Sequence, residues 1–491
     1  MRHEIFRMER VTYPDKGSKR LEDFNLQIYQ GEIMGLVPIS AHGLQELLQL
    51  MQTNMPLYDG YVYYCGERVN SWKSTRRSMN RIGIIDAHSR LVEHMTVSDN
   101  IFVLRQGFRQ NIIKGKLLQK QLAPFMRDIE MQIPADAYVN KLPAFERVVV
   151  ELLRAVVAGY RLIVLNEIST VINGEELTKL YEIMHHYAGQ GFSFLYISLH
   201  LEEIMEVCDR VALFSNGRIQ KVDYRAEMTN EIVQNYTFEF DKMIRYHMGT
   251  RNAVEREKET VLSLSHITGD VLSDFSMEVY KGECLVVQNL DEQVHRDILY
   301  MLCGEKSPKS GEFCMSGRPI QPAVCRDFAL ISADPAKTMV FRGMSYLDNL
   351  CMGLSRRVPG IWKNARMKNS VKKEYEEILG KDVFSMPVET LGERQKCQLV
   401  YTRILLQKPK VVVCVQPFKG ADLTHRVFIW QMMETLLDKG MAVVILTINL
   451  ADSMSLADRL ICVGKEGIVQ EVCREEFGSI SINAPWLDLY R

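Results

Sequence analysis

Long apolar runs, paired cysteines and a strong net charge are all absent from this sequence. No uninterrupted apolar run approaches the roughly 18 residues that a membrane-spanning helix needs, so any association with a membrane is expected to be peripheral. The 11 cysteines include no CxxC pair, and several lie in apolar stretches, which is typical of buried thiols in a reducing cytosol. The net charge of −1 gives no reason to expect a nucleic-acid partner. No metal site is predicted, and the first residues show no apolar signal region.

The phosphate-binding string GxxxxGK[ST] is also missing, although the strand, turn and helix in which it occurs are present twice. In that string the glycines let backbone N–H groups surround phosphate, the lysine reaches the β and γ phosphates, and the hydroxyl holds Mg²⁺. The first frame passes through Gly43, and Leu44 and Gln45 then stand where lysine and hydroxyl belong. The second frame has His295 and Arg296 at these positions. Leu44 and Gln45 can do neither task, and His295 and Arg296 are poor substitutes.

The two frames belong to a duplicated sequence. Gly31 and Gly282 lie 251 residues apart (282 − 31), and Arg154 and Arg403 lie 249 apart (403 − 154). A nearly constant offset that persists along most of the chain predicts two tandem copies of one domain, since chance similarity would drift. Each half is long enough to bury a core of its own.

Within each half, short apolar runs alternate with helical patterns, which predicts the α/β class with a mostly parallel sheet covered by helices. The runs 162–165 and 411–415 are predicted to be central strands buried on both faces. Residues from about 97 to 154 show few strand signals and are predicted to form a helical insertion. A polar, charged stretch without apolar periodicity predicts a linker at 241–259. The predicted domains are therefore 1–240 and 260–491.

A family resemblance emerges from the segment Tyr196–Glu203 and from the run Cys208–Val211 that follows it. Together they resemble the YISHKLEEI…CDRV segment of the tandem ATP-binding subunits of carbohydrate-import ABC transporters of the ribose, galactose and xylose type. The resemblance spans the whole chain and needs no gap through either phosphate-loop region. It implies two tandem P-loop NTPase-like ABC domains, a cytoplasmic location and a sugar permease as partner at the inner face of the membrane. It also implies Mg-ATP as the cofactor of active members.

In active members of this family, ATP lies between the phosphate loop of one half and an LSGGQ-type signature of the other. By position, the resemblance places the first signature at Leu142–Glu146 and the second at Leu391–Gln395, and neither keeps the full motif. The Mg²⁺-binding aspartate is Asn166 in the first half and Val415 in the second, and the general-base glutamate is Glu167 in the first and Gln416 in the second. Both composite sites therefore lack groups on both sides. Losing one electrostatic donor typically costs ~10²–10³ in rate, so turnover is expected near background.

Several of these residues have an ordinary structural interpretation beside the functional one. Glu167 is a catalytic base only if the chain is active, and otherwise a polar residue at a strand end. Tyr13 stands where the family stacks an aromatic ring on adenine, and is alternatively a plain edge-strand aromatic. His42 and Gly43 form either a small anion nest or a helix-entry turn. His200 is either a surface histidine at a helix start or a substitute for the displaced switch histidine.

Three hypotheses follow. The first, which we favour, is a pseudo-ATPase that requires no cofactor and acts as a structural or regulatory partner of a permease or another ABC subunit. The second is a functional energising subunit of a carbohydrate importer that uses Mg-ATP. The third is a sensor that binds a different anionic ligand in the vacated cleft. The sequence retains the strand cores and turns while it lacks the phosphate-binding residues, which favours the first hypothesis, a structural role.

Overall fold

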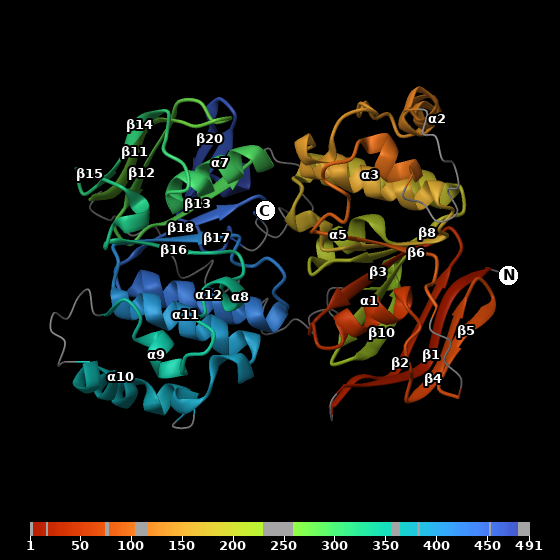
Figure 1. Cartoon of the computed structure of the whole chain (residues 1–491), viewed down its shortest axis with the longest axis horizontal. Coiled ribbons are helices and arrows are strands. Elements are labelled where there is room, and N and C mark those ends of the chain that lie inside the picture. The colour runs from red at the N-terminus through yellow and green to blue at the C-terminus, as the bar shows by residue number, and fades with distance from the viewer. Residues whose placement is uncertain are drawn as a thin grey trace. The chain divides into compact units, whose positions relative to one another are not determined.

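The computed structural model describes residues 3–15, 18–73, 78–103, 115–228, 259–354, 364–380, 383–450 and 453–479. These described residues divide into two compact units, 3–228 with 422–424, and 259–421 with 425–479. The predicted linker, 241–259, lies outside the described residues except for Glu259. Each unit is an α/β domain with parallel strands at its centre (Figure 1), which confirms the predicted fold class.

The first unit is built on two sheets. An antiparallel sheet has the strand order β2-β1-β4-β5, and a six-stranded sheet has the order β10-β9-β3-β8-β7-β6, in which only β10 runs antiparallel to its neighbour. The strands are β1 Glu4–Asp15, β2 Ser18–Tyr29, β3 Ile33–Pro38, β4 Asp59–Tyr64, β5 Glu67–Ser71, β6 Ile82–Asp86, β7 Leu162–Asn166, β8 Ser193–Ile197, β9 Arg210–Ser215 and β10 Arg218–Tyr224. The helices are α1 Leu44–Gln52, η1 Asp99–Val103, α2 Gly115–Asp128, η2 Val139–Lys141, α3 Ala144–Val157, η3 Ile168–Thr170, α4 Gly174–Gly189, α5 Leu201–Val207 and η4 Arg225–Glu227.

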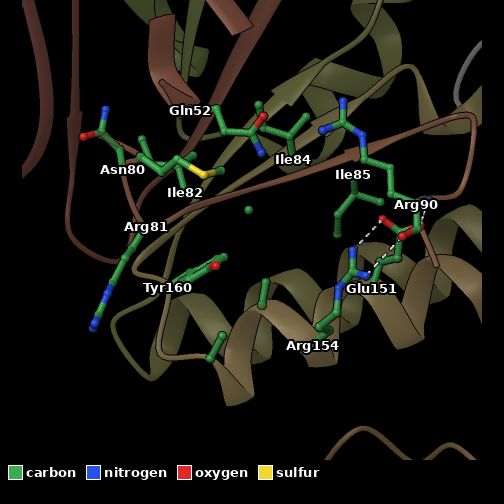
Figure 2. A pocket seen from close by; sticks show the side chains of 14 residues that line it. Gln52, Asn80, Arg81, Ile82, Ile84, Ile85, Arg90, Glu151, Arg154 and Tyr160 are labelled. Atoms are coloured by element: carbon green, nitrogen blue, oxygen red, sulfur yellow. Dashed lines mark hydrogen bonds and ion pairs between the residues drawn. The ribbon is translucent and has the colours of Figure 1, made fainter. Parts of the chain in front are cut away.

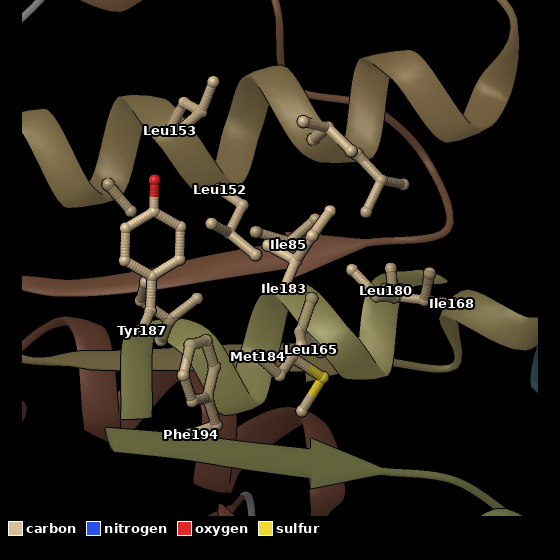
Figure 3. Packing of buried hydrophobic residues seen from close by; sticks show 14 of the residues in the cluster. Ile85, Leu152, Leu153, Leu165, Ile168, Leu180, Ile183, Met184, Tyr187 and Phe194 are labelled. Carbon is tan, nitrogen blue, oxygen red and sulfur yellow. The ribbon is translucent and has the colours of Figure 1, made fainter. Parts of the chain in front are cut away.

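The central strands are buried on both faces because successive side chains enter two different cores. In β7, Ile163 and Leu165 belong to the core under α3 and α4, whereas Leu162 and Val164 belong to the core that contains α1 and the antiparallel sheet. Figure 1 shows α3 and α1 on opposite sides of the sheet. Figure 3 shows the first of these cores, where side chains of α3, α4 and β7 interlock. The continuous apolar run predicted this arrangement correctly.

The second unit repeats the plan of the first. Its sheets have the orders β12-β11-β14-β15 and β16-β17-β18-β13-β19-β20. The strands are β11 Thr260–Thr268, β12 Phe275–Tyr280, β13 Cys284–Asn289, β14 Ser310–Met315, β15 Arg318–Ile320, β16 Phe328–Ile331, β17 Val411–Val415, β18 Ala442–Thr447, β19 Arg459–Gly464 and β20 Gly467–Cys473. The helices are α7 Glu292–Cys303, η5 Pro322–Val324, α8 Pro335–Thr338, α9 Tyr346–Leu350, α10 Asn364–Leu379, η8 Val383–Ser385, η9 Val388–Thr390, α11 Glu393–Gln407, α12 Leu423–Asp438 and η10 Arg474–Ser479.

The duplication extends to individual hydrogen bonds. Asn100 accepts a hydrogen bond from the Val92 N–H at 2.8 Å, and Asn349 accepts one from the Phe341 N–H at 2.8 Å. The predicted helical insertion is confirmed in the first unit, where η1, α2, η2 and α3 occupy it. Its counterpart in the second unit contains α9, α10, η8, η9 and α11. The loops around these asparagines are therefore held by the same contacts in both halves.

Each unit contains a buried glutamate–arginine pair that joins a strand end to the turn before the phosphate-loop strand. Arg210 donates to Glu32 through Nε at 2.6 Å and through Nη2 at 3.3 Å. Arg459 donates to Glu283 through Nε at 2.8 Å and through Nη2 at 3.2 Å. We call these two pairs the latches. The dipeptide that contains each arginine, Asp209-Arg210 and Asp458-Arg459, is itself repeated at the 249 offset (458 − 209), so it has the same structural role in both halves.

All 11 cysteines are free thiols. Cys284, Cys414 and Cys462 are buried as predicted, and burial raises the pKa of the Cys462 thiol to about 11. Cys65 and Cys303 are exposed. Within the described ranges, no helix is long and apolar enough to cross a membrane.

Candidate functional site

The loop between β3 and α1 keeps the turn of a phosphate loop. Gly43 precedes α1 with φ of 90°, and no side chain caps the helix there. A Cβ atom at this position would lie 2.2 Å from the carbonyl oxygen of Arg20. Only glycine fits this conformation and this close approach. The shape of the first loop is thus retained, although its chemistry has changed.

The side chains of the first loop are arranged for packing. Leu44, in the lysine position, is only 8% exposed and belongs to the core of this unit. Gln45 is exposed. The His42 N–H donates to Ser40 Oγ at 3.3 Å, and the Leu44 N–H donates to the Ala41 carbonyl at 3.0 Å. These N–H groups bond within the loop, where a phosphate nest would need them to point at a ligand.

The corresponding segment of the second unit has become helix. α7 begins at Glu292, three residues before His295, whereas α1 begins at Leu44, which is the position equivalent to His295. Asp291 caps α7 and accepts a hydrogen bond from the Gln293 N–H at 2.6 Å. Val294, equivalent to Gly43, is 0% exposed and lies in the core. A carboxylate therefore occupies the helix N-terminus, which is the end that would otherwise attract phosphate.

His295 is buried behind this helix turn and is 6% exposed, whereas Arg296 is exposed. The Asn289 side-chain nitrogen lies 2.9 Å from His295 Nδ1, the distance of an N–H that donates to a neutral ring. Burial lowers the pKa of His295 to about 4, helped by Lys419 and opposed by Glu292. A neutral buried imidazole cannot replace the phosphate-binding lysine.

Because His295 is buried in its neutral form, we expect the second unit to lose stability in acid. The pKa of His295 falls from 6.5 to about 4 on folding, so the unfolded chain binds the proton more tightly than the folded chain does. The contribution of neutral His295 to the stability of the second unit is therefore fully present above pH 6.5 and is lost as the pH falls toward 4. His295→Gln is expected to remove roughly 3 kcal/mol of this pH dependence, measured by urea unfolding at pH 7.5 and pH 4.5. His266→Gln is the control, because His266 is 79% exposed in its pair with Asp274. Equal acid sensitivity in wild type and His295→Gln would contradict the prediction.

The ends of the central strands keep their backbone shape in both units. Glu167 follows β7 with φ of 52°, and Gln416 follows β17 with φ of 40°. Both φ values lie in the left-handed region, where a residue other than glycine lowers the stability of the fold by about 1–3 kcal/mol. The Asn166 side-chain amide donates to Asp86 Oδ1 at 3.1 Å, and Val415 is buried in the core. The two strand ends that would carry the Mg²⁺-binding aspartate thus hold an amide and a valine.

The two signature positions start helices. In the first unit Pro143 precedes α3, Phe145 is buried, and burial raises the pKa of Glu146. In the second unit Gly392 precedes α11 and its N–H donates to Gln395 Oε1 at 3.2 Å. The flexible serine and glycine backbone of an LSGGQ motif is replaced by capping and packing groups.

The first half of the chain, over residues 21–170, matches the ABC transporter family. The whole chain is 22% identical to the putative ribose/galactose/methyl galactoside import ATP-binding protein of Halalkalibacterium halodurans, with 96% of this chain and 92% of that protein covered. It is 24% identical to the xylose import ATP-binding protein XylG of Geobacillus kaustophilus, with 97% of each covered. Among solved structures, RNase-L Inhibitor shares the fold, with a TM-score of 0.59, 13% identity and coverage of 96% of this chain and 92% of that one.

Over nearly its whole length the chain is thus similar to sugar-import ATP-binding proteins, and it carries two tandem ABC-like domains.

In this ABC-like chain, the predicted loop and strand-end residues fall into three groups. Gly43, Leu44 and Gln45 lie together at the start of α1, and Asn166 and Glu167 lie together after β7. His295 and Arg296 lie within α7 rather than at its start. The prediction of a loop before His295 is therefore wrong for the second unit, because Asp291 begins the helix early.

Tyr13 and His200 are both half-buried. Tyr13 lies in β1, which pairs with β2 and β4, but the pairing with β4 ends at Thr12 and Tyr13 itself pairs only with Leu21 of β2, so the edge-strand interpretation stays a prediction. It packs against the core of the first unit. His200 is the N-cap residue of α5, and its N–H donates to Ser198 Oγ at 3.1 Å.

Sequence reasoning missed Glu203, which is 0% exposed and accepts hydrogen bonds from Ser198 Oγ at 2.7 Å and from the Tyr196 hydroxyl at 3.0 Å.

A small charged pocket of about 210 Å³ lies between the edge strand β6 and helix α3 (Figure 2). We call it the arginine pocket, because Arg81, Arg90 and Arg154 line it together with Glu151. Glu151 Oε1 accepts a hydrogen bond from the Arg90 N–H at 2.7 Å, and Oε2 lies 3.6 Å from Arg154 Nη2. Burial raises the pKa of Glu151. Gly83 lets α3 approach, since a Cβ there would lie 3.0 Å from Ala155 Cβ.

Proposed function

We propose that this ABC homologue is a non-hydrolysing subunit that acts as a structural or regulatory partner in a sugar-import type of assembly. The observation that carries the proposal is the early start of α7. With Asp291 at the helix N-terminus and Val294 in the core, the second loop offers neither the backbone N–H groups nor the lysine that hold a triphosphate. The burial of Leu44 supports the same conclusion for the first loop.

The proposed partner is a permease or another ABC subunit, and the proposed location is the inner face of the membrane. Support comes from the similar proteins, which are named as import ATP-binding proteins for ribose, galactose and xylose. The described residues also include exposed Arg81 and Arg90 at the arginine pocket, which suit an acidic segment of a partner. No cofactor is required in this role.

The proposal predicts that Mg·ATP neither stabilises the protein nor is hydrolysed. A ligand at ~100 times its dissociation constant adds about 2.7 kcal/mol to the stability of the folded state. Millimolar Mg·ATP is therefore expected to leave the melting temperature unchanged, and phosphate release is expected to stay at the rate of a Glu167→Gln control. Phosphate release that the Glu167→Gln variant abolishes would establish an energising ATPase and contradict the proposal.

The preserved turn at Gly43 favours one second candidate, which is nucleotide binding without turnover at the first loop. The uncapped N-terminus of α1 and the αL conformation of Gly43 are the features that a phosphate would use. A melting shift with Mg·ATP that Leu44→Glu removes, without phosphate release, would support this candidate. A shift with sugar phosphates but not with ATP would instead support a sensor.

A further inference from the structure

We propose that the second unit contains a binding site for a small anion with an apolar body, at a place that is separate from the nucleotide region. The site is a cavity of about 650 Å³ between α10 and the C-terminal ends of α11 and α12. Its volume falls in the range of about 300–1,000 Å³ that small-molecule pockets have. We call it the α11–α12 pocket.

The α11–α12 pocket lies at the opposite edge of the sheet from the phosphate loop. It is lined by Lys408, Pro409 and Lys410, which precede β17, and by Lys439 and Met441, which precede β18. The phosphate loop and the catalytic positions follow the carboxyl ends of these parallel strands. A ligand in the α11–α12 pocket would therefore not occupy the vacated nucleotide site.

Two residues of the lining have buried apolar counterparts in the first unit. At the repeat offset of 249 (402 − 153), Thr402 corresponds to Leu153 and Gln398 to Val149. Leu153 and Val149 are both 0% exposed and belong to the core under α3 and α4. A polar side chain thus stands in place of valine, and a shorter one in place of leucine.

The wall of the cavity is apolar and adaptable. Leu405, Leu406 and Met432 are half-buried, and Met441 is buried. Methionine side chains are flexible and polarisable, so they adjust to the shape of an apolar ligand. Tyr375 adds an aromatic face, and burial, followed by nearby Glu374, raises the pKa of its hydroxyl. The wall therefore suits an alkyl chain or a flat ring.

The charged members of the lining are exposed, which places them around the mouth of the pocket. Lys408, Lys410 and Lys439 bring three positive charges, and Glu374 brings one negative charge. Lys410 donates to Ser316 Oγ at 3.0 Å and lies 3.9 Å from Asp327 Oδ2, so that carboxylate offsets part of its charge. Lys408 and Lys439 still outnumber Glu374 around the mouth. An excess of positive charge above an apolar wall selects a ligand with an anionic head, such as a carboxylate or a phosphate monoester.

Titration calorimetry of the whole chain with octanoate, octyl phosphate and 1-octanol tests the site. Octanoate or octyl phosphate is expected to bind with one-to-one stoichiometry, and whichever binds more tightly identifies the head group. Octanol is expected to bind at least tenfold more weakly, which is about the contribution of one charge-assisted hydrogen bond. Equal binding of octanol would overturn the proposal.

Two variants test the cavity and its charged mouth separately. Thr402→Trp places a bulky ring in the lining and is expected to obstruct the cavity and abolish binding of both anions. Lys439→Gln, which copies Gln190 of the first unit, leaves the cavity open and is expected to weaken anion binding about tenfold. Because Lys439 is exposed, this variant keeps the test valid even if the filled variant fails to fold. Unchanged anion binding in both variants would show non-specific adsorption and overturn the proposal.

Discussion

Arg210→Met and Arg459→Met are each expected to lower the free energy of unfolding of their own unit by about 3–5 kcal/mol. Each substitution removes the cation of a latch and leaves a glutamate that is almost fully buried without its partner. The side chains of Arg210 and Glu32 are 13% and 5% exposed, and those of Arg459 and Glu283 are 12% and 8% exposed. Urea unfolding followed by circular dichroism, with both transitions fitted, measures the loss in each unit.

The matched control for the latches is Arg218→Met. Arg218 also pairs with a glutamate, but its side chain is 49% exposed and that of Glu22 is 36% exposed. Exposed pairs contribute about 0–1 kcal/mol, so this variant is expected to unfold almost as the wild type does. If all three variants lost similar stability, the loss could not be assigned to burial of the latches.

Gly43→Val and Val294→Gly, which exchange the residues at one equivalent position, are both expected to destabilise the protein. Gly43 adopts φ of 90° with the Arg20 carbonyl oxygen 2.2 Å from the site of a Cβ, so a β-branched residue must displace backbone, at a cost of about 3 kcal/mol or more. Val294→Gly empties a buried position and places glycine in a helix, with an expected loss of about 3 kcal/mol. The same unfolding experiment measures both.

Two further substitutions separate the causes of these losses. Val294→Ala keeps a good helix former and is expected to retain part of the stability that Val294→Gly loses, because only the cavity remains. Gly115→Val is the control for glycine replacement, since a Cβ at Gly115 meets nothing within 4 Å. A Gly43→Val variant as stable as wild type would mean that the first loop does not need its left-handed turn.

The parts of the fold that were predictable are those that depend on local pattern and repetition. The run 162–165 predicted β7 because a strand buried on both faces must be apolar throughout. The strand, turn and helix frame placed Leu44, and the family resemblance placed Asn166 and Glu167 after the predicted strand 162–165. The identities of these side chains then gave the chemistry that is missing.

Other features depend on contacts between distant residues, and pattern alone could not supply them. The arginine pocket joins Arg90 to Glu151, 61 residues further along. The position of β1 inside its sheet depends on its pairing with β4, about 50 residues away. The early start of α7 was within reach of local rules, because Asp291 is a preferred N-cap residue and no glycine follows it before Gly304.

The early start of α7 makes the two halves unequal starting points for engineering. In the first half the turn at Gly43 and the corner at Glu167 are already shaped, so a designer who wished to reinstall phosphate chemistry would exchange side chains on an unchanged scaffold. In the second half the same change requires unwinding the first turn of α7, which Asp291 caps, and finding another buried position for Val294. Directed evolution toward nucleotide binding is therefore expected to find its first solutions in the N-terminal domain.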